Sequence, residues 1–368
     1  MSAHYIEGGD ILIDNGIIVD VGQNIDYAPK RTDDVIDASD CFVFPGFIDA
    51  HSQVGIALDG IGDLFMLSNP ITPNLSVINS IKYDDPVFYE CLRAGITSVV
   101  VAPFERNIVG GKCALIKTAQ IPSVFSGKAD TSHIVSEFCA MKFSLAADTQ
   151  NHESNLALRA TMLKNDIQAA KSYFRERKTA NTAFFESPTL ESYEPILNRE
   201  IPAYFYVKTA EELKMALRIS KQFNFTSTIV GCNDCERVDE ALLIEIREYS
   251  NSIVLGPCIT RTSKGFEFAK QLSENKMPFA LSTAYPRTNI QYLPMIAGLS
   301  VRDGVPIEKA FAAITINAAI ACRAFDKIGS IEVGKQADIA IFDANPLEVF
   351  TKTLYTIVNG RIAYKIEE

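Results

Sequence analysis

The stretch Phe44-Pro45-Gly46-Phe47-Ile48-Asp49-Ala50-His51-Ser52-Gln53 decides how the rest of this chain is interpreted. A strand through it places His51 and Gln53 on one face, because residues two apart on a strand point the same way. An imidazole there suits a divalent metal of the zinc type, whereas the amide of Gln53 is a poor ligand for such a metal. The chain has four histidines, and His51 alone occupies a position suited to a metal.

Length and composition narrow the class of protein. A chain of 368 residues, 47% hydrophobic and 22% charged, is typical of a large folded barrel with a minor domain. Its net charge of −10 argues against nucleic-acid binding and against a basic membrane-binding surface. No apolar run reaches the roughly 18–20 residues that span a bilayer, and residues 1–5 do not resemble a signal peptide. We therefore expect a cytoplasmic protein whose eight cysteines are reduced thiols.

Both ends of the chain are rich in strand patterns. Asn15-Gly16 lies between two β-branched runs, and Asn359-Gly360 lies between two more, which is a strong hairpin signal. A further apolar strand pattern covers residues 338–343. These patterns predict a small β-sandwich assembled from residues 1–44 and 326–368.

The middle of the chain alternates strand and helix patterns. Residues 95–103 and 202–207 are apolar runs bounded by breakers, as strands buried on both faces should be. Thr209 and Glu212 form a capping-box pattern that predicts a helix to about residue 223. Further candidate strands cover residues 227–230, 252–255 and 278–282. The fold class is thus α/β, with a (β/α)8 TIM barrel over residues 45–325, and a doubly wound open sheet is the alternative.

These motifs resemble the amidohydrolase superfamily, nearest to its imidazolonepropionase-related branch. The stretch from Pro45 to Gln53 is similar to the family pattern P-G-x-I-D-x-H-x-H of the first barrel strand. The most specific similarity lies in Ala313-Ile314-Thr315-Ile316-Asn317-Ala318-Ala319 and in Gly329-Ser330-Ile331-Glu332-Val333-Gly334-Lys335-Gln336-Ala337-Asp338. The resemblance implies a barrel of amidohydrolase type and a hydrolase acting on carbon–nitrogen bonds other than peptide bonds, through metal-bound water.

At most positions where the resemblance implies a metal ligand, this chain has a different type of residue. Near strand four, where a bridging carboxylate or carbamylated lysine is implied, the chain has Lys142 and then Ala147-Asp148. The H-A-H of strand five corresponds to Tyr206-Val207-Lys208, and the histidine of strand six falls near Gly231 and Cys232. The T-D-H-P of strand eight corresponds to Thr283-Ala284-Tyr285-Pro286. In the family that aspartate takes a proton from the metal-bound water, and alanine cannot act as a base. The comparison therefore predicts a degenerate metal site.

The candidate site residues all lie at or near the ends of predicted strands. They are His51, Gln53, Lys142, Tyr206, Lys208, Cys232, Asp234 and Tyr285. His51 either holds a metal or is a hydrogen-bonded polar residue, and Lys142 is either carbamylated or a buried point charge. Tyr206, Lys208 and Tyr285 either line a polar ligand pocket or fill a vacated metal cavity. His4, His133 and His152 are interpreted as exposed loop histidines.

Cys232 and Cys235 form a C-x-x-C pattern at the end of the sixth predicted strand. Two thiolates at this spacing bind zinc, with His51 and Asp234 as the further ligands available, or act in redox chemistry. The alternative is that both are small apolar fillers.

Three functions remain open from the sequence. The first is a catalytically weak or inactive relative with a small-molecule pocket, which makes the chain a pseudoenzyme candidate. The second is an active hydrolase of cyclic amides, with one metal on His51 and Cys232 or metal-free catalysis by Lys208 and Asp234. The third is a thiol-based role for Cys232 and Cys235. No cofactor is firmly implied, although one zinc-like divalent metal stays open. The expected partners are a small molecule and a second copy of the chain in a homo-oligomer.

Overall fold

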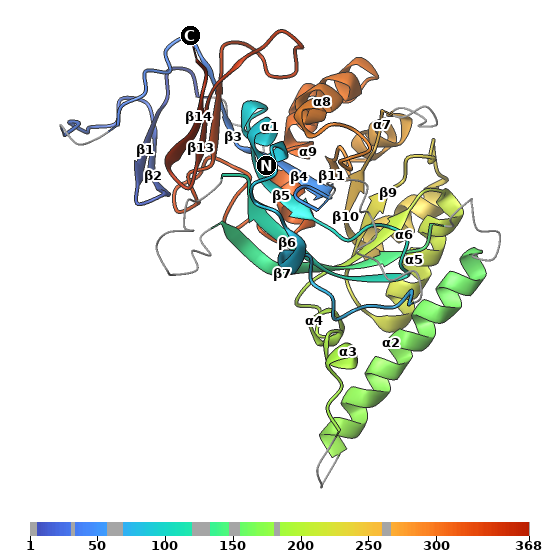
Figure 1. Cartoon of the computed structure of the whole chain (residues 1–368). Coiled ribbons are helices and arrows are strands. Elements are labelled where there is room, and N and C mark those ends of the chain that lie inside the picture. Colours follow the sequence, from blue (N-terminus) through green and yellow to red (C-terminus); the bar gives the residue numbers. More distant parts are fainter. Residues whose placement is uncertain are drawn as a thin grey trace.

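A computed structural model describes residues 6–30, 34–56, 69–119, 133–146, 155–179, 185–259 and 266–367. Figure 1 shows a barrel-like sheet surrounded by helices, with smaller sheets at one side that contain strands from both ends of the chain. Among the described residues no helix is long and apolar enough to cross a membrane.

The barrel is an eight-stranded sheet in which the strands follow one another in chain order. Its strands are β4 (Phe47–Ser52), β5 (Ile96–Val101), β6 (Val109–Lys117), β7 (Ile134–Ser144), β8 (Ala203–Val207), β9 (Ser227–Gly231), β10 (Ser250–Leu255) and β11 (Phe279–Leu281). The hydrogen-bonded ladder runs from β4 to β11 and does not continue between these two end strands. The predicted barrel of amidohydrolase type is confirmed as a nearly closed barrel.

One strand departs from the predicted repeat of eight parallel units. β6 runs antiparallel to both β5 and β7, whereas the other neighbouring pairs are parallel. An antiparallel strand can be reached by a short return, while a parallel one needs a crossover. Residues 102–108, which join β5 to β6, accordingly contain no helix. Strict β/α alternation was therefore the wrong expectation at this point.

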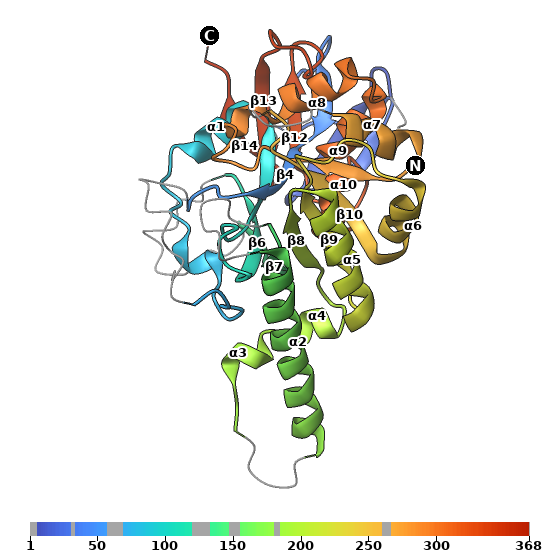
Figure 2. The same ribbon diagram turned by 90° about the vertical axis from the view of Figure 1, so that its right-hand side faces the viewer.

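Helices cover the outside of the sheet. They are α1 (Val87–Arg93), α2 (Leu156–Thr179), α3 (Pro188–Glu191), α4 (Glu194–Leu197), α5 (Ala210–Phe223), α6 (Glu240–Tyr249), α7 (Glu267–Glu274), α8 (Leu293–Arg302), α9 (Ile307–Ala313) and α10 (Ile316–Ala321), with 3-10 turns η2 (Val77–Ser80) and η3 (Ile290–Tyr292). α5 begins with the predicted capping box, in which Thr209 and Glu212 bond each other's backbone. α2 extends beyond the barrel, with α3 beside it (Figure 2).

Alternating residues along the strands divide the core into two layers. On β8, Tyr204 and Tyr206 belong to the inner cluster, and Phe205 belongs to the outer cluster beneath the helices. α10 contributes to the inner cluster, and Thr228 at the start of β9 donates to the Ala321 carbonyl at 3.2 Å. α10 thus covers the amino ends of the strands, and the carboxyl ends are left to form the site.

The two chain ends build the small sheets, as predicted. β1 (Asp10–Asp14) and β2 (Ile17–Gly22) form a hairpin. β3 (Phe42–Pro45) pairs with β12 (Ile339–Phe342), which continues through β13 (Thr353–Val358) to β14 (Arg361–Lys365). Ile11 and Ile13 of the hairpin pack against Ile339, Ile341 and Ile357 of the other sheet. The residue boundaries expected for the two domains, at 44/45 and 325/326, stay a prediction.

A buried ion pair connects the small sheets to the barrel. Lys117, at the end of β6, bonds Asp338, just before β12, and both side chains are less than 5% exposed. Asp338 also accepts from the Asn359 backbone N–H at 3.0 Å, and its carbonyl accepts from Gly46 N–H at 2.8 Å. The Asp338 carboxylate therefore connects the barrel to β13–β14, and the Asp338 backbone carbonyl holds the entry to β4.

Asp338→Ala is expected to lower the free energy of unfolding by about 3–5 kcal/mol, because it leaves the Lys117 ammonium buried without its counter-charge. The measurement is urea denaturation followed by circular dichroism. Arg237→Ala, which removes an exposed ion pair with Glu274, is the control and should cost under about 1 kcal/mol. Equal losses in the two variants would contradict this role for the Lys117–Asp338 pair.

Candidate functional site

Three predicted site residues meet inside the barrel near the carboxyl ends of the strands, a region called here the barrel mouth. His51 on β4, Lys142 on β7 and Tyr206 on β8 are all fully buried. Lys142 Nζ contacts His51 Nε2 and lies 4.9 Å from the centre of the Tyr206 ring. The His51 and Tyr206 rings stack with their centres 6.0 Å apart. The structure thus brings an imidazole, an amine and a phenol into one cluster.

An irregularity in β4 directs the side chain of His51 toward this cluster. Ile48 and Ala50 already face the inner layer, so simple alternation would send His51 outward. The pairing of β4 with β5 shifts register between Asp49 and Ser52, which allows His51 to point inward as well.

A buried carboxylate holds this irregular strand end against β11. Asp49 Oδ1 accepts from the His51 backbone N–H at 3.1 Å. Asp49 Oδ2 accepts from Thr283 N–H at 3.0 Å and from Thr283 Oγ1 at 2.6 Å. Ser282 Oγ donates to the His51 carbonyl at 2.5 Å, and Gln53 N–H donates to the Tyr285 carbonyl at 2.9 Å. Side-chain bonds therefore join β4 to β11 where the ladder ends, and they fix the backbone on both sides of His51.

Two charged residues outside the predicted set lie near the cluster. Arg287 pairs with Glu105 at 3.6 Å, and the charges of both residues affect the pKa values of Lys142 and Tyr206. Arg159, at the start of α2, donates to the Glu105 carbonyl at 3.5 Å and to the Ser144 carbonyl at 3.1 Å. Arg159 thus links the Glu105 loop to the carboxyl end of β7.

Burial shapes the protonation of the cluster. It lowers the pKa of His51 well below its ordinary value, and the charges of Lys142 and Arg287 lower it further. Burial also lowers the pKa of Lys142, although the negative charge of Glu105 opposes this shift. The pKa of Tyr206 is raised, first by burial and then by Glu105. The imidazole and the phenol are therefore neutral at pH 7.

Several polar atoms around the barrel mouth are buried and have no hydrogen-bond partner among the described residues. They are His51 Nδ1, Gln53 Nε2, Glu105 Oε1, Ser144 Oγ and Tyr206 Oη. Buried polar groups are normally paired in folded proteins, and leaving one unpaired costs about 1–3 kcal/mol. A polar molecule bound at the barrel mouth would supply the missing partners.

The remaining predicted residues lie around this cluster and do not join it. Lys208 follows β8, its N–H donates to Glu212 Oε2 at 2.6 Å, and its carbonyl accepts from Asp234 N–H at 3.1 Å. Tyr285 packs against the outer cluster, where burial and the charge of Asp85 raise its pKa. His133 is half-buried, and its ring meets the Tyr83 ring edge-on with the two ring centres 4.6 Å apart. Its interpretation as an exposed loop histidine was therefore wrong.

Cys232 and Cys235 belong to the outer cluster, away from the layer that holds Tyr206. Gly231 and Cys232 have φ values of +104° and +54°, so the chain turns there and the side chain of Cys232 does not continue the inner face of β9. The pKa of Cys232 is raised by its hydrogen bond with Cys235 and by burial. Neither feature favours a thiolate, and thiolates are the form that binds metal or reacts.

The described residues do not fit a divalent metal at the barrel mouth. Among them no three His, Cys, Asp or Glu side chains gather in a metal-binding group. His51 Nε2, the nitrogen that faces inward, is in contact with the Lys142 amine. A Cβ at Gly231 would lie 2.3 Å from the Val207 carbonyl oxygen, so that position has no room for a ligand side chain. The candidates Ala147, Asp148 and His152, like His4, lie outside the described residues.

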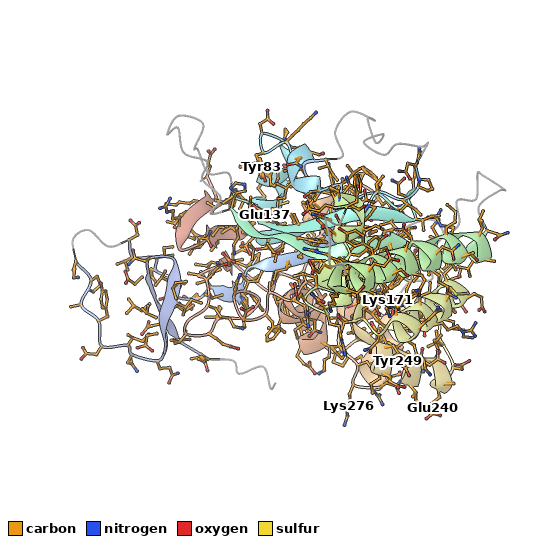
Figure 3. The ribbon with its side chains drawn as sticks, turned by 90° about the horizontal axis from the view of Figure 1, so that it is seen from below. Tyr83, Glu137, Lys171, Glu240, Tyr249 and Lys276 are labelled. Carbon is orange, nitrogen blue, oxygen red and sulfur yellow. The ribbon has the colours of Figure 1, made fainter. Side chains whose placement is uncertain are left out.

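Two hollows in the described structure lie at the other end of the strands. One of about 290 Å³ is lined by Ser250, Ser252 and Pro278, at the amino ends of β10 and β11. Lys276 at its rim is labelled in Figure 3, near Tyr249 and away from the small sheets. A smaller hollow of about 180 Å³ adjoins Val135 and Ile201, at the amino ends of β7 and β8. Neither hollow contains a residue of the His51 cluster.

The sequence is similar to those of known amidohydrolases. A family model described as amidohydrolase family matches residues 280–364. An imidazolonepropionase from Picrophilus torridus is 26% identical, covering 98% of this chain and 91% of its own. The chain is therefore similar to amidohydrolases, over residues 280–364 by the family model and over nearly its whole length by this relative.

Solved structures support the amidohydrolase fold. An amidohydrolase from Thermotoga maritima superposes with a TM-score of 0.83 at 24% identity, covering 97% of this chain and 95% of its own. An adenosine deaminase from Xanthomonas campestris, solved with bound zinc, reaches a TM-score of 0.55 at 17% identity, covering 98% and 89%. The resemblance stated from sequence motifs is confirmed at the level of the superfamily and its fold.

Thr283→Val is expected to lower the free energy of unfolding by about 1.5–3 kcal/mol, because it removes a hydrogen bond to the buried Asp49 carboxylate. Chemical denaturation provides the measurement. Thr161→Val is the control, since the Thr161 hydroxyl is exposed on α2 and bonds only the Ala157 carbonyl in its own helix. If both variants lost less than about 0.5 kcal/mol, the Asp49–Thr283 bond would not be holding β4 against β11.

His51→Gln should flatten the pH dependence of stability below pH 6.5. The unfolded chain protonates His51 near its ordinary pKa of 6.5, whereas the folded protein does not until the pH is much lower. Wild-type stability is therefore expected to fall by up to about 1.4 kcal/mol per pH unit as the pH drops below 6.5. Urea denaturation at about six pH values between about 5.0 and 7.5 compares the wild type with His51→Gln and with the control His133→Gln. A slope that persists in His51→Gln would count against a buried neutral imidazole.

Proposed function

We propose that this protein binds a small polar molecule at the barrel mouth and does not carry out metal-activated hydrolysis. The observation that carries the proposal is the contact between Lys142 Nζ and His51 Nε2, at the nitrogen that a metal would need. A lysine amine and a divalent cation compete for the same lone pair and repel each other when both are charged.

The loss of a catalytic base supports the same conclusion. Metal-activated hydrolysis depends on lowering the pKa of bound water from 15.7 to about 7 and on a group that takes its proton. At the end of β11, where the family resemblance implies an aspartate, Ala284 is fully buried. Its N–H donates to Ser282 Oγ at 2.9 Å, and that hydroxyl in turn donates to the His51 carbonyl.

Ligand binding is supported by the unpaired polar atoms at the barrel mouth. Gln53 and Tyr206 offer donors, Glu105 offers an acceptor, and Arg287 adds a positive charge nearby. The carboxyl ends of barrel strands are also where proteins of this architecture place their sites. Retention of a small polar ligand therefore accounts for groups that the protein itself leaves unsatisfied.

An active hydrolase of cyclic amides is the second candidate. It is favoured by the similarity to an imidazolonepropionase over nearly the whole of both chains. Such an activity would need a rebuilt or mononuclear metal site that includes residues beyond the His51 cluster.

The protein, purified without chelator or histidine tag, is expected to contain well under about 0.1 equivalent of divalent metal. Zinc or manganese should shift its Tm by less than about 1 °C, because no site binds the metal in the folded state preferentially. Mass spectrometry of metals and thermal unfolding provide the measurements. The zinc-holding adenosine deaminase from Xanthomonas campestris, prepared in parallel, is the positive control. One equivalent of metal, together with turnover of a cyclic amide that His51→Ala abolishes, would replace this proposal by the second candidate.

A further inference from the structure

The hollow of about 290 Å³ at the amino ends of β10 and β11 carries a local excess of positive charge. Arg247, from the last turn of α6, and Lys276, from the turn between α7 and β11, both line it. Among the described residues that line it there is no aspartate or glutamate. In a chain with a net charge of −10, such a surface is one that attracts anions.

The two positive charges are not neutralised by the protein itself. Arg247 and Lys276 form no ion pair with a carboxylate within the described part of the chain, and the acidic residues beside them in the sequence have partners elsewhere. Glu274, two residues before Lys276, pairs with Arg237 at 2.9 Å. Glu248, next to Arg247, accepts from the neighbouring tyrosine hydroxyl at 2.5 Å. Both cations therefore remain available to a ligand.

Capping of helix ends explains only part of this arrangement. α6 and α7 both end beside the hollow, and helix carboxyl ends favour basic residues by themselves. Arg247 serves α7 in this way, because its Nη2 donates to the Asn275 carbonyl at 3.3 Å. A guanidinium has five N–H groups, so this bond leaves four of them. Lys276 ends the helix through its backbone, whose N–H donates to the Ser273 carbonyl at 3.0 Å, and its amine is not needed for that.

The inner wall of the hollow is apolar. Ile246, Ile253 and Met277 are buried side chains that line it, and Pro278 lies beside them. Pockets that hold small molecules typically begin at about 300 Å³, so this hollow suits a molecule with one small ring or a short chain. Positive charges beside a buried apolar wall fit a ligand with an anionic head and an apolar body.

We propose that this hollow binds a small organic anion, with its carboxylate or phosphate group between Arg247 and Lys276 and its apolar body against Ile253 and Met277. Barrel enzymes carry out their reactions at the carboxyl ends of the strands, so this is a binding site and not a second catalytic centre. The inference is independent of what the barrel mouth binds.

Met277 supplies a local probe for the test. Labelling the protein with methyl-¹³C methionine gives NMR signals from its seven methionines, and Met277→Leu identifies the Met277 signal. Titration with benzoate, and separately with phenyl phosphate, at constant ionic strength should shift this signal with a Kd of about 1 mM. The signal of Met162 on α2, assigned in the same way, should not move. Binding of either anion supports the site, and the tighter of the two identifies the preferred anionic group.

Two further ligands separate the charge from the apolar body. Benzamide has nearly the same shape as benzoate but no charge, and it should bind at least about tenfold more weakly because it forms no charge-assisted hydrogen bonds. Inorganic phosphate has the charge but no apolar body, and it should also bind at least about tenfold more weakly than phenyl phosphate.

Arg247→Gln and Lys276→Asn should each weaken benzoate binding about five- to tenfold, because each removes one positive charge. Asparagine suits the left-handed backbone at this lysine, where φ is +55°. Arg302→Gln is the matched control, since Arg302 also lies in the last turn of a helix but does not line the hollow. A role in helix capping alone would lower the Tm of Arg247→Gln and leave its affinity for benzoate unchanged.

A Met277 signal that stays unmoved up to about 20 mM of both anions would overturn the inference. Equal binding of benzamide and benzoate, or wild-type affinity in both charge variants, would do the same. Because the titration of the wild-type protein stands by itself, the test holds even where a variant fails to fold. Metal content is measured separately, so this inference and the proposed function can fail independently.

Discussion

Closure of the barrel depends on the Asp49 carboxylate. The strand ladder ends at β11 on one side and β4 on the other, and Asp49 spans the two by accepting from His51 N–H and from both donors of Thr283. Burial raises the pKa of this carboxyl group, and the bonds from Thr283 oppose that rise. The same carboxylate fixes the backbone of His51. The shape of the barrel and the position of the imidazole are therefore set by one interaction.

The charge inside the barrel depends on which of the two fully buried lysines is paired with a carboxylate. Asp338 neutralises Lys117 near the small sheets, whereas Lys142 at the barrel mouth has an imidazole beside it. Burial lowers the pKa of His51 and of Lys142, although the negative charge of Glu105 opposes the shift at Lys142.

The sequence predicted those features that depend on local patterns. Asn-Gly turns marked both hairpins of the small sheets, and apolar runs located β5, β8 and most later strands. The direction of side chains at strand ends was harder, because it depends on register shifts and positive φ angles. His51 turns inward after Ala50, and Cys232 turns outward after Gly231, against simple alternation. Glu105 and Arg287 were missed because they lie in loops. Asp49 could have been identified from the sequence, because the Ile48-Asp49 pair stands just before His51 in the same strand pattern.

The Lys117–Asp338 pair joins residues 221 positions apart, so its consequences extend to how the chain folds. During synthesis β6 emerges long before Asp338, and β3 emerges even longer before its partner strand β12. Contacts of such sequence separation carry a large loop-closure entropy and form late. Until Asp338 has been synthesised, Lys117 lacks the carboxylate with which it pairs in the native barrel. The barrel therefore reaches its native set of contacts only after the strands that follow Asp338 have been synthesised.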